Sequence, residues 1–487
     1  MSAAAATPAP RRVSNSTTFA YAVGAAAYGI KDSGFGTFLL LFYNQVVGVA
    51  PSTVGFIIMC ALILDALIDP AVGALSDRTR SRWGRRHPWM YAAALPIAIG
   101  WLLLWNPPEM SDGATYAWLF VTAVIVRSAV SCYEVPSQAL TPELTSDYDE
   151  RTRITAWRYL LGWAGGLVML LLAYQVFLTP RPGYPNGLLR AGGYHQMALV
   201  AAALMVVAIL FSAIGTHREI KRLPRPAIER QSFTGHFREL AQTMKNRAFV
   251  VLILAGMCVY TNQGVGYALS NYLYSFVWQF SGATFALFPI ALFAGVICAF
   301  VLAPLIGRRT SKPRAAVWLV AANVVFLTLP YWLRLAHAFP EVGSPALVPL
   351  LLALIVVHTA CSVSAFILGA SMMADVVEES EARTGRRSEG VFFAGSFFVQ
   401  KCTSGIGIFL AGVMLQVAHF PQGAHPGQVP VPTLDRLTLI YAGAYVVLGL
   451  AAAFLFTRFP FGRAEHEARL ARMAASAEVE GAPHAGS

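Results

Sequence analysis

The chain has 487 residues, of which 56% are hydrophobic and only 13% are charged, and its mean hydropathy is +0.56. Soluble globular proteins carry about 25% charged residues, so this composition excludes a soluble enzyme or binding domain. The net charge of +11 could indicate nucleic acid, but the basic residues lie in short connections between apolar runs, as in membrane proteins. We therefore expect a lipid bilayer, and no nucleic acid, as a partner.

Apolar runs of 18 or more residues recur along the chain, and each is long enough to cross a bilayer as a helix. The runs are continuous and do not alternate, which excludes a porin-like barrel. We predict an all-α membrane protein with twelve transmembrane helices. The expected spans are 17–46, 52–76, 88–106, 114–141, 153–178, 193–215, 247–278, 282–306, 314–334, 346–373, 390–417 and 435–458.

Basic residues concentrate in every second connection, which predicts that both termini are cytoplasmic. An internal repeat supports two halves: Arg78-Thr79 recurs as Arg309-Thr310, at an offset of 231 residues, and Arg151-Thr152 recurs as Arg383-Thr384, at an offset of 232. Such parallel halves are the major facilitator arrangement. We expect a disordered N-terminus (1–16), a six-helix bundle (17–215), a cytoplasmic linker (216–246), a second six-helix bundle (247–458) and a cytoplasmic tail (459–487).

Two carboxylates, Asp65 and Asp69, lie four residues apart inside the apolar run 54–75. This spacing is about one helical turn, so both project from one helix face. Acids at membrane depth are costly and usually face a cavity or a partner. Two close carboxylates can hold a monovalent cation or share a proton near neutral pH. The pair therefore predicts a cation site.

Other ionisable residues also lie inside the predicted spans. Asp32 and Glu134 offer acceptors for hydroxyl groups, and Arg158 offers a forked donor. Lys401 could compensate the acid pair when no cation is bound. Arg127 lies seven residues before Glu134 on one helical face, and we interpret it as a structural partner of that acid.

Charged residues at the predicted cytoplasmic ends of the spans could form pairs that close the inner side. The predicted gating residues are Asp77, Arg78, Arg85, Arg86, Glu143, Arg151, Asp375, Arg383 and Arg387. Gly162-x-x-x-Gly166 predicts close helix packing. Nucleotide-loop, nucleophile-triad and metal-ligand patterns are missing from the sequence, so we expect neither an enzyme nor a cofactor.

The chain resembles the glycoside–pentoside–hexuronide:cation symporters from about residue 19 to residue 459. Its markers are Lys31-Asp32, Asp65-x-x-x-Asp69-Pro70, Tyr133-Glu134-Val-Pro136, Arg158, Met373-Ala-Asp375, Arg387-Ser-Glu389 and Lys401. The resemblance implies the major facilitator fold. It implies a cation site at Asp65, Asp69 and Lys401, with Ser131 as a further oxygen donor. It also implies a substrate site at Lys31, Asp32, Tyr133, Glu134, Gln138, Arg158, Phe366 and Lys401.

Three positions depart from melibiose permease, a member of that family. Ile68 replaces an Asn that helps to hold sodium, and Gln138 and Phe366 replace two Trp residues. A sodium ion needs several oxygen ligands, whereas a proton needs one carboxylate. We therefore predict a proton as the coupling ion, with sodium at Asp65 and Asp69 as the alternative. The two lost Trp residues put a galactoside in doubt.

These observations predict a secondary active transporter that carries a sugar or glycoside, a small-molecule substrate, by alternating access. We expect a monomeric, multi-pass protein of a bacterial inner membrane. A carrier of a lysolipid or other amphiphile is the first alternative, because a lysolipid-carrying branch resembles the same family. A non-transporting receptor or scaffold is the second, and it would not need a cation pair opposite a lysine.

Overall fold

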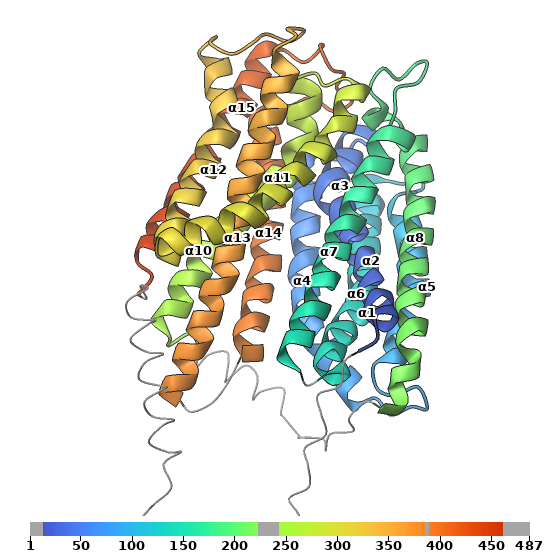
Figure 1. Cartoon of the computed structure of the whole chain (residues 1–487). Helices are drawn as coiled ribbons and strands as arrows, with labels where there is room; N and C mark the ends of the chain where they lie inside the picture. The colour runs from blue at the N-terminus through green and yellow to red at the C-terminus, as the bar shows by residue number, and fades with distance from the viewer. Residues whose placement is uncertain (1–12, 146, 223–242, 385–388, 461–487) are drawn as a thin grey trace, which may run out of the picture. The chain divides into compact units, whose positions relative to one another are not determined.

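The computed structural model describes residues 13–145, 147–222, 243–384 and 389–460, and the regular structure in these ranges is helical (Figure 1). Eleven helical segments of the described ranges are long and apolar enough to cross a membrane. They confirm an all-helical, multi-pass membrane protein. The long helices are α4 (Pro51–Arg78), α5 (His87–Leu104), α6 (Asp112–Leu144), α7 (Tyr148–Leu172), α8 (Ala191–His217), α10 (Arg247–Tyr272), α11 (Gly282–Arg309), α12 (Lys312–Leu335), α13 (Leu347–Thr384), α14 (Glu389–Val417) and α15 (Val431–Thr457).

The first predicted span, 17–46, is helical but interrupted, so the count of twelve stays a prediction. The interruption lies at Gly24, where the hydroxyl of Tyr133 and the side chain of Ser212 occupy the space that a Cβ would fill. The pieces are α1 (Asn15–Val23), α2 (Ala25–Ser33), the π-helical turn η1 (Gly34–Phe38), α3 (Leu39–Leu41) and a second π-helical turn, η2 (Phe42–Val46).

Two more π-helical turns continue long helices. The turn η3 (Ala173–Phe177) follows α7, and η6 (Leu273–Val277) follows α10. Both lie at the ends of these helices that the loop charges place on the outer side of the membrane. Short 3-10 turns, η4 (Gly187–Leu189) and η5 (Arg218–Arg222), flank α8. Because π-helical turns are rare and often mark functional positions, the outer ends of these helices are candidate functional positions.

The chain forms two compact units. The first comprises Met1–Arg230, Gln263–Pro289 and Ser404–Leu437, and the second comprises Gln231–Asn262, Ile290–Thr403 and Thr438–Ser487. The first unit thus contains the whole of the predicted first bundle together with parts of α10, α11, α14 and α15. The predicted division into bundles 17–215 and 247–458 stays a prediction. The predicted linker (216–246), N-terminus (1–16) and tail (459–487) lie largely outside the described residues.

Close helix packing in the first unit depends on glycine. A Cβ at Gly29 of α2 would collide with the backbone of Gly162 on α7, and a Cβ at Gly165 would lie 2.5 Å from the Ala26 carbonyl. The prediction that Gly162-x-x-x-Gly166 mediates close packing is confirmed. This approach brings the charged residues of α2 and α7 into one region of the unit.

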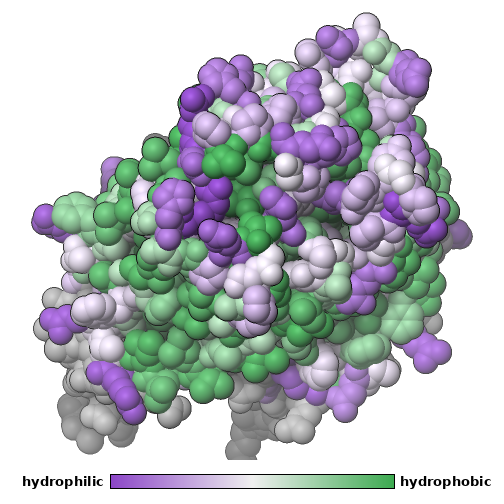
Figure 2. Space-filling view, turned by 90° about the horizontal axis from the view of Figure 1, so that it is seen from above, coloured by the Kyte–Doolittle hydropathy of each residue, from purple (hydrophilic) through white to green (hydrophobic). Residues whose placement is uncertain are grey.

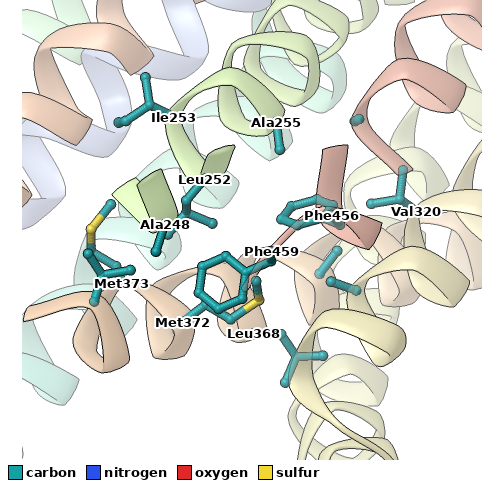
Figure 3. Close-up of a cluster of buried hydrophobic side chains, with 14 of the residues drawn as sticks. Ala248, Leu252, Ile253, Ala255, Val320, Leu368, Met372, Met373, Phe456 and Phe459 are labelled. Atoms are coloured by element: carbon teal, nitrogen blue, oxygen red, sulfur yellow. The ribbon is translucent and has the colours of Figure 1, made fainter. Parts of the chain in front are cut away.

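The core of the second unit is an apolar cluster shared by five helices and Phe459, which lies just beyond the last of them. Figure 3 shows Met372 and Leu368 of α13 near Phe456 of α15 and Phe459. Ala248 and Leu252 of α10 belong to the same cluster and are buried. These side chains fill space between the helices of the unit.

Large apolar side chains also cover the outside of the helices. Trp318, Val301 and Val447 lie mid-helix and are 72%, 68% and 67% exposed. Figure 2 shows such apolar side chains on the flanks of the molecule and hydrophilic ones on the loops. Exposed apolar surface of this extent is costly in water and is the normal exterior of a membrane helix, whose backbone hydrogen bonds are internal.

Candidate functional site

The predicted cation-site acid Asp65 lies buried between α4 and α6, with 3% of its surface exposed. Arg127 of α6 donates to its Oδ2 from Nε at 3.1 Å and from Nη2 at 2.9 Å. Ser131, one turn further along α6, donates to Oδ1 at 2.8 Å. We call Asp65, Asp69, Arg127 and Ser131 the acid site.

The interpretation that Arg127 pairs with Glu134 is wrong. The guanidinium of Arg127 reaches across to Asp65 on α4, and its Cζ lies 5.3 Å from the centre of the Phe35 ring. The reason is the packing of α4 along α6, which brings an acid of another helix closer than one two turns away on the same helix. Asp69, one turn beyond Asp65, is half-buried, and Ile68 beside it offers an alkyl group where an oxygen ligand could have been.

A second group, which we call the polar cluster, joins α1, α6 and α7. Arg158 Nη2 lies 2.7 Å from Glu134 Oε1 as an ion pair, and Gln138 donates to the same oxygen at 2.9 Å. Arg158 Nη1 donates to Ser137 at 2.7 Å, and its guanidinium lies 5.2 Å from the Tyr21 ring centre. The cluster therefore contains Tyr21, Glu134, Ser137, Gln138 and Arg158, and the structure brings three predicted substrate residues together.

One atom of the polar cluster, Oε2 of Glu134, is buried but makes no hydrogen bond with a described residue. Nη2 of Arg158 is held in the ion pair with Glu134. Buried polar atoms are rarely left without a hydrogen bond in native structures. The cluster therefore has an acceptor to offer to a ligand.

Of the neighbouring residues Lys31 and Asp32, Lys31 lies in the interior and Asp32 lies at the surface. Lys31 is buried, and its Nζ lies 4.1 Å from the Tyr28 ring centre and 3.5 Å from Asp32 Oδ1. The Asp32 side chain is 51% exposed. Lys31 can therefore fix the position of the Asp32 carboxylate, which is the accessible member of the pair.

Tyr133 is placed differently from the prediction of a substrate contact. It is fully buried, and its hydroxyl donates to Ser212 of α8 at 3.1 Å, against the Gly24 backbone. The Tyr133 side chain leaves α6 at about 100° from that of Glu134, because consecutive helical residues are about 100° apart. We therefore leave Tyr133 out of the proposed substrate site.

The predicted residues of the second unit are Lys401 and Phe366. Lys401 is half-buried on α14, and Phe366 stacks on Tyr260 with ring centres 5.5 Å apart. Their approach to the acid site and to the polar cluster stays a prediction, because those residues belong to the other unit.

Charged residues gather at the predicted cytoplasmic end of α4 and α6. Arg86 bonds to Asp77 at 2.5 Å, to Glu143 at 3.1 Å and to Ser76 at 2.7 Å. Arg85 reaches Glu143 at 2.7 Å. We call Ser76, Asp77, Arg85, Arg86 and Glu143 the inner charge cluster. It joins four of the predicted gating residues within one unit.

The remaining predicted gating residues lie elsewhere. Arg78 is exposed, and Arg151 donates to the backbone carbonyls of Thr145 and Pro142. Asp375 accepts from Lys312 at 2.7 and 2.8 Å within the second unit. Arg387 and the side chain of Arg383 lie outside the described residues, so their predicted pairing with Asp375 is untested.

An uncharged network occupies the opposite, predicted outer end of the first unit. Tyr174 of η3 donates to Asn271 Oδ1 at 2.7 Å, and Asn271 donates to the Thr37 carbonyl of η1 at 2.9 Å. Tyr272 donates to Asn44 of η2 at 2.7 Å. These side chains are at most 2% exposed.

The same network extends to the loop that follows α14. Gln45 donates to Asn44 at 2.6 Å and to the Pro421 carbonyl at 3.1 Å, and it accepts from the Ala424 amide at 2.9 Å. We call Thr37, Asn44, Gln45, Tyr174, Asn271 and Tyr272 the outer network. It ties the first predicted span to segments that follow the predicted linker.

Sequence reasoning missed Tyr21, Ser137, the partner of Arg127 and the outer network. One signal was available for Arg127: it lies four residues before Ser131, and this spacing puts a cation and a hydroxyl on one helix face. Tyr21 and Ser137 carry no comparable signal, because a single polar residue in a span is compatible with many partners.

The sequence matches the family described as "MFS/sugar transport protein" over residues 20–463. It is 27% identical to an uncharacterized symporter of Synechocystis (92% of this chain, 95% of the relative) and 25% identical to the isoprimeverose transporter of Lactiplantibacillus pentosus (91% and 88%). It is 24% identical to the sodium-dependent lysophosphatidylcholine symporter 1 of Gallus gallus (92% and 87%).

The fold is similar to that of solved transporters. The crystal structure of a mutant of the nucleoside transporter NupG superimposes with a TM-score of 0.63 and 15% identity. The match covers 91% of this chain and all of the NupG chain. At this identity the likeness shows the fold alone.

Proposed function

We propose, because the chain belongs to the MFS/sugar transport protein family, that this membrane transporter is a cation-coupled symporter of a sugar or glycoside. Its site would alternate between the two sides of a bacterial inner membrane, with both termini in the cytoplasm. The symporters among its relatives support coupling to a cation. The proposal of a sugar or glycoside as substrate rests on the polar cluster.

The polar cluster suits a ligand with several hydroxyl groups. Glu134 Oε2 can accept a hydrogen bond and is buried without one in the described chain, and the ion pair places the Arg158 guanidinium beside it. The exposed Asp32 carboxylate adds acceptors. A site built from buried polar groups rejects ligands that leave those groups unpaired. A polyhydroxylated ligand would therefore be favoured over one with a single polar group.

For the coupling ion, a proton is favoured over sodium. Sodium requires several oxygen ligands. Ile68 supplies none from its side chain, and both oxygens of Asp65 already accept bonds from Arg127 and Ser131. A proton needs only one carboxylate, and the half-buried Asp69 offers it.

A lysolipid or other amphiphile is the alternative substrate. One relative is named as a lysophosphatidylcholine symporter, and the stacked pair Phe366 and Tyr260 presents aromatic surface in the second unit. The polar cluster favours the sugar, because several hydroxyl groups of one ligand can pair with Glu134 and Arg158, whereas the acyl chain of a lysolipid cannot.

A thermal-shift screen of the purified protein with sugars, glycosides and lysolipids would identify the substrate class, and uptake into proteoliposomes would then establish transport. We expect Glu134→Gln to weaken binding of the sugar by about tenfold or more, because a hydrogen bond to a charged group contributes about 1.5–3 kcal/mol. Glu109→Gln, in an exposed loop, is the matched control. Binding of lysolipid alone would favour the alternative.

The coupling ion is tested by uptake at fixed pH with and without sodium, and by uptake driven by an imposed pH gradient. We expect accumulation to follow the pH gradient in sodium-free buffer. A strict requirement for millimolar sodium, with no response to the gradient, would show that the proton assignment is wrong. Absence of uptake for every compound, with or without a gradient, would instead support a receptor or scaffold.

A further inference from the structure

The loop between α4 and α5, residues 79–86, connects two helices that are each long and apolar enough to cross a membrane, so it lies at a membrane surface. The Thr79 hydroxyl accepts a hydrogen bond from the Trp89 indole at 2.8 Å. The Ser81 hydroxyl donates to the Gly84 carbonyl at 2.8 Å, and Gly84 has a φ of 74°, which favours glycine. These contacts give the loop an ordered shape.

Three arginines of this region have no acidic partner. The inner charge cluster pairs two neighbouring arginines with its two carboxylates. By contrast, Arg78, Arg80 and Arg82 are exposed and form no ion pair with a described residue. Like charges within five residues of one another repel. A bound anion would relieve this repulsion.

The same region also presents apolar side chains. Trp83 is 40% exposed, and its ring centre lies 5.6 Å from that of Tyr91 and 5.2 Å from the Arg82 guanidinium. Tryptophan is enriched at membrane interfaces, where its ring lies at the level of the lipid headgroups. Leu75 of α4 is 54% exposed and lies three residues before Arg78, so the two share one helix face. The apolar side chain comes first and the basic one follows, as the acyl chain and the headgroup do in a lipid.

We propose that Leu75, Arg78, Arg80, Arg82 and Trp83, which we call the lipid patch, bind the headgroup and the upper acyl chain of an anionic phospholipid of the inner leaflet. Guanidinium groups form strong, charge-assisted hydrogen bonds with phosphate oxygens. Because the loop is already ordered, little conformational freedom is lost on binding. The positive-inside rule accounts for the charges, but it requires neither an ordered loop nor an exposed tryptophan.

Lipid retention tests the basic part of the lipid patch. The full chain is reconstituted into vesicles of equal parts phosphatidylglycerol and phosphatidylcholine with the same acyl chains and extracted into a neutral detergent. The lipid that stays bound is then quantified by mass spectrometry. We expect wild type to retain phosphatidylglycerol over phosphatidylcholine by about tenfold or more, since each arginine near an anionic headgroup contributes about fivefold.

The double variant Arg80→Gln with Arg82→Gln should reduce this preference to about threefold or less. Arg309→Gln with Arg314→Gln is the matched control, because it removes two exposed arginines from the connection between α11 and α12. The control should keep the wild-type preference within about twofold. Equal losses in the two double variants would overturn the proposal, because they would show a general attraction between basic loops and anionic lipid. All four substitutions alter exposed side chains, and an unchanged thermal midpoint verifies folding.

The apolar part of the lipid patch is tested at Trp83. Trp83→Ala should lower the retained phosphatidylglycerol by about fivefold, because the indole no longer covers the acyl chain, whereas Trp83→Tyr should keep at least about half. Inorganic phosphate at about 20 mM should leave the lipid bound, since it cannot replace the contacts with Leu75 and Trp83. Full displacement by phosphate, or no effect of Trp83→Ala, would overturn the assignment to a lipid. These measurements use no transported substrate, so their outcome is independent of the proposed symport.

Discussion

The two ends of the first unit are held together by different chemistry. The outer network consists of amide and phenol side chains and backbone carbonyls, and its side chains are almost fully buried. The inner charge cluster consists of two arginines and two carboxylates, of which Asp77 is 54% and Arg85 24% exposed. Neutral bonds in a dry interior do not depend on ionic strength, whereas exposed ion pairs are screened by salt. The two ends should therefore respond separately to salt and to charge.

The largest expected effect is at the most buried charge of the inner cluster. Arg86→Ala should lower the free energy of unfolding by about 3 kcal/mol, because it removes the partner of Asp77, Ser76 and Glu143 at once. Arg85→Ala should cost about 1 kcal/mol or less, since Glu143 keeps Arg86 and Arg85 is partly exposed. Denaturant unfolding in detergent measures both. Equal losses of unfolding free energy in the two variants would show that the burial of an arginine does not determine its contribution to stability.

A second, smaller effect is expected at the outer network. Asn271→Ala leaves the Tyr174 hydroxyl and the Thr37 carbonyl without this partner, so it should cost about 2 kcal/mol. The loss should be the same in about 0.05 and 0.5 M salt. Asn106→Ala, at an exposed residue that bonds only to its own helix turn in the described structure, is the control. A salt-dependent loss at Asn271 would contradict the neutral character of this end.

The smallest effect is expected at the partly exposed pair of the second unit. Lys312→Met and Asp375→Asn should each change the free energy of unfolding by less than about 1 kcal/mol, because Lys312 is 34% exposed. The double variant measures the coupling between the two residues. A loss above about 2 kcal/mol in either single variant would indicate further partners for that residue.

Much of the helical frame could be predicted because long apolar runs have few alternatives in a membrane. The span expected at 52–76 is Pro51–Arg78 in the structure, with Pro at the first turn, where its missing N–H costs nothing. The first span could not be predicted in detail. At Gly24 the hydroxyl of Tyr133, from another helix, lies where a Cβ would stand, and this contact is tertiary information.

The candidate site shows the same limit. The cost of burying charge identified Asp65, Glu134 and Arg158 as residues that need partners, and the structure supplies a partner for each. Which partner each one takes depends on how α4, α6 and α7 pack. The sequence therefore predicts Glu134 as the partner of Arg127, whereas the structure pairs Arg127 with Asp65. It likewise predicts a substrate contact for Tyr133, whose hydroxyl donates to Ser212. The gating role of the inner charge cluster remains a prediction for the same reason.

The π-helical turns give the outer ends of these helices a property that an ordinary helix lacks. Each such turn accommodates one residue more than an α-helical turn, so it stores a register shift of one position. If η2 tightened into an α-helix, the helical segments on its two sides would rotate relative to each other by about 100°. Asn44 and Gln45 lie within η2, so their bonds to Tyr272 and to the loop after α14 depend on the extra residue of this turn.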